Sequence, residues 1–211
     1  TVVIVTADHG EGLMEHGYLM HGLGVYEEEV HVPLLMRWSG QLPAGRRIAE
    51  PVMLNDVLPT VLSFAGTSAA AGDVPGINLH AVISGRESIS SDRLVFMHRR
   101  HYADMYANAA LPGMYSAENE PEAIHLLGQQ YAVRKGRWKY TISPELGVQE
   151  LYDLERDPGE LDDVSAEEPG ISESLKGDLE RWVGEQRRPV EPGAVLLDGD
   201  REALKALGYI E

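Results

Sequence analysis

The sequence has no cysteine among its 211 residues, which excludes disulfide bonds, zinc-thiolate sites and thiol nucleophiles. Basic residues are also scarce, with 18 lysines and arginines against 34 acids and a formal net charge of −16. This surplus of negative charge disfavours nucleic acid and anionic membrane surfaces as partners. No apolar run approaches the roughly 20 residues of a membrane-spanning helix. The remaining composition, 43% hydrophobic and 25% charged, is typical of a globular protein.

The chain opens on a run of β-branched side chains, residues 1–6. Such runs are typical of strands buried on both faces, most often in parallel sheets. A parallel strand needs neighbours and none precedes this one, so we expect the chain to be the C-terminal piece of a longer protein. An open sheet edge of this kind also predicts pairing with a second copy, giving a homodimer.

The patterns that follow predict an α/β portion over residues 1–88 and a second portion over 89–211, an antiparallel sheet with a covering helix. Residues 101–129 are the least regular stretch. The expected strands cover 1–6, 31–38, 93–98, 131–134, 138–142 and 150–154, and the expected helices cover 55–65, 79–84, 171–186 and 201–207.

The residues with the most chemical potential follow the first strand. Asp8 and His9 come directly after it, and Gly10 lets the chain turn away. Ligands of α/β sheets bind at the carboxyl ends of strands, and a carboxylate beside an imidazole suits a divalent cation. His21 lies 12 residues after His9, far enough for the loop to fold back over the same cavity. On these residues alone, an Asp-His pair that merely caps a turn remains an alternative.

The order of motifs along the chain resembles the sulfatase family of the alkaline phosphatase superfamily. The first half carries TADHGE, EHG, HG, YEE and VPLLMRWSG, and the second carries VRKGRWKY, ELYDL and DPGE. The resemblance implies the C-terminal part of the catalytic α/β sandwich for residues 1–88 and the family's C-terminal subdomain for 89–211. It implies a sulfuric ester hydrolase acting on sulfate monoesters, and it is compatible with a periplasmic or secreted location that no signal in the sequence assigns.

The same resemblance implies roles for four residues. Asp8 and His9 match metal ligands of a site that usually holds calcium, although many members carry Asn in place of His9. His21 falls where many relatives place a lysine that contacts the sulfate and the leaving oxygen, where a donor stabilises developing charge; a histidine there makes that help depend on pH near neutrality. His16 is a weaker substrate-binding candidate that could instead only orient the loop.

The family's nucleophile, a hydrated formylglycine made from Cys or Ser in a C/S-x-P-x-R motif, has no counterpart in this sequence. We therefore expect the isolated chain to be inactive and to bind calcium weakly or not at all, since two ligands are few for that ion. A phosphonate monoester or phosphodiester hydrolase is the first alternative, favoured by His9 and His21. A non-catalytic assembly or carbohydrate-binding module is the second.

The remaining charged clusters are interpreted more simply. The acids Glu27, Glu28 and Glu29 are expected at a helix start on a solvated face. The basic group at 134–139 is expected in a hairpin that faces the acidic C-terminal third. Arg99, Arg100 and His101 could reach an anionic substrate from the second portion.

Overall fold

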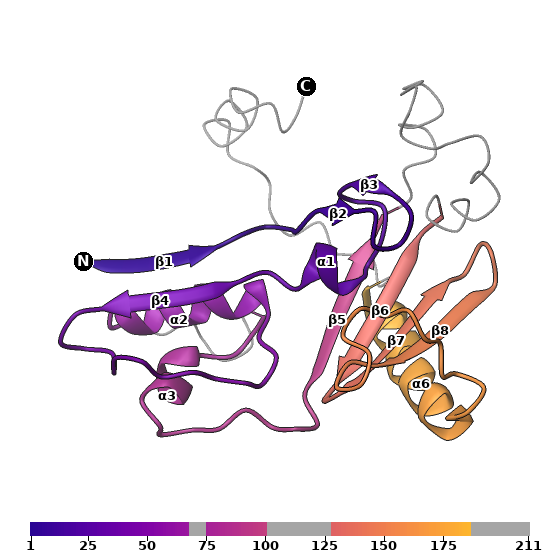
Figure 1. The fold of residues 1–211 in the computed structure, drawn as a ribbon. Coiled ribbons are helices and arrows are strands. Elements are labelled where there is room, and N and C mark those ends of the chain that lie inside the picture. Colours follow the sequence, from indigo (N-terminus) through magenta and orange to yellow (C-terminus); the bar gives the residue numbers. More distant parts are fainter. Residues whose placement is uncertain (68–74, 101–127, 187–211) are drawn as a thin grey trace, which may run out of the picture. The chain divides into compact units, whose positions relative to one another are not determined.

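The computed structural model describes residues 1–67, 75–100 and 128–186 (Figure 1). Two compact units result, Thr1–Leu179 and Glu180–Glu211, and the elements described below belong to the first, apart from the last turns of the final helix. The irregular stretch at 101–127 and the helix expected at 201–207 lie outside the described residues. The division at residue 88 stays a prediction.

The first sheet has two strands, β1 (Val2–Thr6) and β4 (Leu34–Trp38). They pair antiparallel, from Val2 opposite Trp38 to Thr6 opposite Leu34, so the expectation of a parallel, doubly buried first strand is wrong for the described residues. A β-branched run favours a strand but does not set its direction. One face of this sheet is open to solvent, because the alternate side chains of Val3, Val5 and Leu35 are exposed.

The other face of β4 contributes to a hydrophobic core. Leu34 and Met36 pack against a buried cluster of Leu79, Val82 and Ile89. The helices beside this strand are η1 (Leu54–Asp56), α2 (Val57–Phe64) and α3 (Leu79–Ile83), close to the expected bounds. Asp56, fully buried, accepts from the Met53 N–H at 2.8 Å and pairs with Arg93 at 2.7 Å. This carboxylate therefore starts η1 and anchors the helical segment to the chain that follows.

Between β1 and β4 the chain forms a small hairpin and one helical turn. Strands β2 (Gly12–Leu13) and β3 (Leu19–Met20) pair with Gly12 opposite Met20. Helix α1 (Glu27–Val30) follows, and Tyr18, Leu23 and Tyr26 form a buried cluster with Tyr152. This cluster packs the segment against the second half of the chain.

The antiparallel sheet expected in the second portion is present, and it has four strands in the order β5-β6-β7-β8. Its strands are β5 (Leu94–Arg99), β6 (Gln130–Lys135), β7 (Trp138–Ser143) and β8 (Val148–Asp153). Helix α6 (Pro169–Gln186) buries Leu175 and Leu179, four residues apart on one face. The α/β fold class with an antiparallel sheet and a covering helix is confirmed. Among the described residues, no helix has both the length and the apolar character of a membrane span.

Candidate functional site

The end of β1 places Asp8 and His9 side by side at the surface. The Asp8 carboxylate is 88% exposed and its Oδ2 lies 3.8 Å from His9 Nε2. The His9 ring nitrogen Nδ1 lies 2.8 Å from the Gly10 carbonyl oxygen. A proton on Nδ1 that is donated to this carbonyl leaves the lone pair on Nε2, beside the carboxylate. The two side chains therefore converge rather than diverge.

The short β2–β3 hairpin returns His21 to the same place. Glu11 precedes the ladder and His21 follows it, and their side chains meet with Nδ1 of His21 3.0 Å from the Glu11 carboxylate. The His21 ring stacks on the His9 ring with 4.1 Å between centroids and 23° between planes. The spacing between the two histidines is thus taken up by a hairpin, and the structure brings Asp8, His9 and His21 together.

These three residues line a cavity of about 830 Å³. The same cavity is lined by three arginines, Arg99 at the end of β5, Arg100 directly after it and Arg134 of β6. Arginine forks suit sulfate, phosphate and carboxylate oxygens. The cavity therefore combines the Asp8–His9 edge with a basic wall of arginines, of which Arg134 is paired with Glu27. His101, the third residue expected to reach an anion, lies outside the described residues.

His16 has a different environment. Its Nδ1 lies 2.6 Å from Glu28 Oε1, its Nε2 lies 3.0 Å from the Glu160 carbonyl oxygen, and its ring stacks on Tyr26 at 3.7 Å. Burial acts to lower the pKa of His16, but the hydrogen bonds to Glu28 and Glu160 outweigh it and raise that pKa. Both nitrogens are engaged by the protein, and His16 does not line the cavity. This geometry favours the loop-orienting role over substrate binding.

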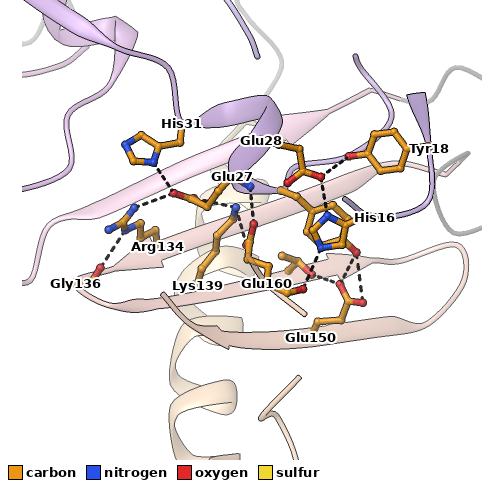
Figure 2. A network of polar contacts seen from close by, with 12 residues as sticks. His16, Tyr18, Glu27, Glu28, His31, Arg134, Gly136, Lys139, Glu150 and Glu160 are labelled. Carbon is orange, nitrogen blue, oxygen red and sulfur yellow. Dashed lines mark hydrogen bonds and ion pairs between the residues drawn. The ribbon is translucent and has the colours of Figure 1, made fainter. Parts of the chain in front are cut away.

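The three acids of α1 are buried or largely buried, so the expectation of a solvated face is wrong. Figure 2 shows Glu27 and Glu28 in a network of polar contacts. Glu27 lies 3.2 Å from both Arg134 and His31. Burial acts to raise the pKa of Glu28, but the hydrogen bond with His16, together with a contact from the Tyr18 hydroxyl, outweighs it and lowers that pKa. Three acids in one turn tolerate burial because each has its own donors.

The basic hairpin explains part of this burial. Lys139 is fully buried, with its Nζ 3.1 Å from Glu27 Oε1 and 2.8 Å from Glu160 Oε1 (Figure 2). Burial raises the pKa of Glu160 in spite of the Lys139 charge. Arg137 pairs with Asp153, which lies in the acidic C-terminal third that the hairpin was expected to face. Lys139 also contacts Glu27 of α1. The hairpin therefore holds the loop that carries the histidines.

The sequence interpretation missed Glu29. This residue is 3% exposed, and its carboxylate accepts bonds from Tyr18, Gly22 and Gly24. The sequence offers one local signal for the role of Glu29. Gly22 and Gly24, whose N–H groups donate to its carboxylate, flank Leu23 shortly before the three acids.

Asp8 and His9 at the cavity edge provide only part of the ligand set that a divalent ion needs. The 3.8 Å between Asp8 Oδ2 and His9 Nε2 is a separation that two ligands of one ion can span, because each ligand lies about 2.0–2.5 Å from a metal. Among residues 1–67, 75–100 and 128–186, no group of three or more His, Cys, Asp or Glu side chains is placed to hold a metal. The hydrogen bond to the Gly10 carbonyl, above all, raises the pKa of His9, so a metal would compete there with a proton. These residues supply a partial ligand set.

Comparisons with known proteins agree with the motif resemblance. The family model described as Sulfatase matches residues 1–67. Arylsulfatase K of Mus musculus is 32% identical over 185 residues, which is 87% of this chain and 30% of that protein. Delta 4,5-hexuronate-2-O-sulfatase of Bacteroides thetaiotaomicron is 28% identical over 83% of this chain and 32% of that protein. The chain belongs to the sulfatase family, and it spans about 30% of the length of these relatives.

Solved structures give the same fold. A protein named BT4656, in complex with its substrate D-glucosamine-2-N,6-O-disulfate, superposes with a TM-score of 0.69 at 25% identity, over 91% of this chain and 36% of that one. The phosphonate monoester hydrolase of Agrobacterium radiobacter superposes with a TM-score of 0.63 at 22% identity, over 94% and 38%. At this identity the second likeness shows only that the two chains share a fold.

Proposed function

We propose that this chain is part of a metal-dependent sulfatase that hydrolyses sulfate monoesters. The observation that carries the proposal is that Asp8, His9 and His21 line one cavity in a member of the sulfatase family. The two relatives described above are named as sulfatases, and the similar protein BT4656 was solved with a sulfated sugar as its substrate. Their names support sulfate esters as the substrate class.

The chain's residues have distinct roles in this proposal. Asp8 and His9 supply two ligands of a divalent ion, calcium by family resemblance, which would polarise a sulfuryl oxygen and offset its charge. Glu11 orients the His21 ring through the 3.0 Å contact to Nδ1. Because Nδ1–H is donated to Glu11, the ring carries a proton on Nε2 only in its imidazolium form, and in that form Nε2–H can donate to the ester oxygen as it leaves. Arg99 and Arg100 lie on the basic wall of the cavity, where positive charge favours an anionic substrate.

The remaining site group, the formylglycine nucleophile, is expected from a segment outside this sequence. Hydrolysis of phosphonate monoesters or phosphodiesters is the second candidate function, favoured by the histidines at positions 9 and 21. Both reactions place an anionic tetrahedral group in the same cavity, so the substrate must be settled by rate measurements.

The test compares the 211-residue chain with a longer protein that includes the missing segment. We expect the longer protein to hydrolyse para-nitrophenyl sulfate faster than the para-nitrophenyl ester of phenylphosphonic acid. We expect the chain alone to hydrolyse neither, because it has no nucleophile motif. Calorimetric titration of the chain alone with calcium should show weak binding or none, because Asp8 and His9 are only two ligands.

A faster rate with the phosphonate ester would replace the first candidate with the second. Turnover by the chain alone would contradict the assignment of the nucleophile to the missing segment. Hydrolysis of neither ester by the longer protein would leave the non-catalytic module as the better account.

We also propose that the isolated chain forms a homodimer through β1. Within the described residues β1 pairs only with β4, so its other edge has no partner strand there. Val3, Val5 and Leu35 are exposed on one face of this two-stranded sheet. An open edge with apolar neighbours favours pairing with another strand. Light scattering should give twice the mass of one chain, and a monomer at high concentration would contradict this.

A further inference from the structure

The loop that carries His21 is fastened by one buried carboxylate, that of Glu29. Oε2 accepts the Gly22 N–H at 2.5 Å, and Oε1 accepts the Gly24 N–H at 2.7 Å and the Tyr18 hydroxyl at 2.7 Å. Gly22 directly follows His21 in the sequence. A carboxylate oxygen that accepts a backbone N–H forms a strong, directional bond when water is excluded. The position of the His21 backbone is therefore set by Glu29.

The backbone of the same helical turn fastens the chain next to His9. The Glu29 carbonyl accepts the Gly10 N–H at 2.7 Å, and the Glu28 carbonyl accepts the Glu11 N–H at 3.0 Å. The approach is so close that a Cβ built on Gly10 would lie 1.9 Å from the Glu28 carbonyl oxygen. Glu29 thus makes hydrogen bonds on both sides of the stacked imidazoles, through its backbone toward His9 and through its side chain toward His21.

The backbone around His21 needs this support. Met20, immediately before it, has a φ of 92°, and Gly22, immediately after it, has a φ of 78°. A non-glycine residue in this region is strained and persists only where surrounding contacts hold it. The contact between Glu29 and Gly22 is such a restraint, and it acts one residue from the imidazole.

We propose that Glu29 is a positioning residue that holds His21 against His9 at the cavity edge. The inference rests on the proposed function for its catalytic meaning, but the geometry can be measured without a substrate. Glu29 lies outside the set of residues that touch the reacting atoms in that proposal, and it acts through the Gly22 amide. Loss of this bond releases the His21 ring while the rest of the fold remains.

The test uses Glu29→Gln in the 211-residue chain. Glutamine keeps one acceptor oxygen for Gly24 and Tyr18 but presents an NH₂ group to the Gly22 N–H, so two donors face each other. The matched control is Tyr18→Phe, which removes another donor to the same carboxylate and leaves the Gly22 bond intact. Ring-proton shifts of His9 and His21 and amide exchange at Gly22 are read by NMR, and the methyl shifts of Leu175 report the fold.

We expect Glu29→Gln to move both histidine ring shifts to those of unstacked rings and to speed Gly22 amide exchange by about 10-fold or more. Tyr18→Phe should keep the stacked shifts. Retention of the stacked shifts in Glu29→Gln, or their equal loss in Tyr18→Phe, overturns the proposal. In the unmodified chain the Gly22 amide must already exchange slowly, and fast exchange there overturns the proposal whether or not Glu29→Gln folds.

These readouts separate the inference from the proposed function. Suppose that the longer protein hydrolyses no sulfate ester, while the stacking of His9 and His21 is intact and depends on Glu29. This result contradicts the sulfatase proposal and leaves the positioning role of Glu29 in place. In an active longer protein, Glu29→Gln should lower kcat by about 10-fold with little change in KM, because the positioned donor acts in the transition state.

Discussion

Lys139→Met is expected to cost the chain about 4 kcal/mol of unfolding free energy, because removal of one partner leaves buried carboxylates without their counter-charge. Lys139 is fully buried between Glu27 and Glu160, at 3.1 and 2.8 Å. Glu160 is itself fully buried at its side chain. Urea denaturation followed by circular dichroism measures the loss.

The matched control is Lys135→Met in the same hairpin. Lys135 is 39% exposed and pairs with the exposed Asp92 at 3.5 Å, and a surface pair of this kind contributes about 1 kcal/mol or less. Adding Glu160→Gln to Lys139→Met should restore part of the stability, since it removes the unpaired charge. Equal losses in Lys139→Met and Lys135→Met would contradict the buried network.

The pH dependence of the Lys139→Met loss has a definite sign. Burial already raises the pKa of Glu160 above its ordinary value of 4.5 in the intact network, and loss of the lysine charge raises that pKa further. A carboxyl group whose folded-state pKa is raised favours the folded state at low pH and loses this contribution as the pH rises through the folded pKa. The loss is therefore expected to be smaller at about pH 5 than at about pH 8.

His21→Ala in the longer protein is expected to lower kcat for para-nitrophenyl sulfate by about 100-fold or more and to change KM by less than about threefold. The reason is that a donor to the leaving oxygen gains most of its bond strength as charge develops. His21 lies at the cavity edge with its Nδ1 held by Glu11 at 3.0 Å. Steady-state kinetics over a range of substrate concentrations separates the two parameters.

His31→Ala is the control for this effect. His31 lines the same cavity but is 72% exposed and pairs with Glu27, so its loss is expected to change kcat by less than about threefold. An unchanged kcat in His21→Ala, or equal effects in the two variants, would remove His21 from the catalytic set.

Local patterns were enough to predict most elements of the fold. The hairpin of β6 and β7 followed from two β-rich runs around a short turn that contains Gly136, and α6 followed from apolar positions at helical spacing that include Leu175 and Leu179. The meeting of His9 and His21 followed from their spacing and from the strand end. These signals lie within one or two elements, where sequence separation is short.

Long-range partners were not predictable in the same way. Glu27 and Lys139 are 112 residues apart, and a run of three acids alone reads as a solvated helix start. The direction of β1 was missed because valine and isoleucine favour strands without favouring a partner, and the antiparallel register is set by the return of the chain into β4. The role of Glu29 depends on N–H groups of Gly22 and Gly24, whose direction no side-chain pattern reveals.

Chelation followed by metal replacement tests the central claim most directly, since it joins the Asp8–His9 edge to ester hydrolysis. In the longer protein, removal of divalent metal should abolish hydrolysis of para-nitrophenyl sulfate, and calcium should restore it to the unmodified enzyme but not to Asp8→Ala. Full activity after verified removal of metal, or restoration of Asp8→Ala to the unmodified rate, would contradict the account.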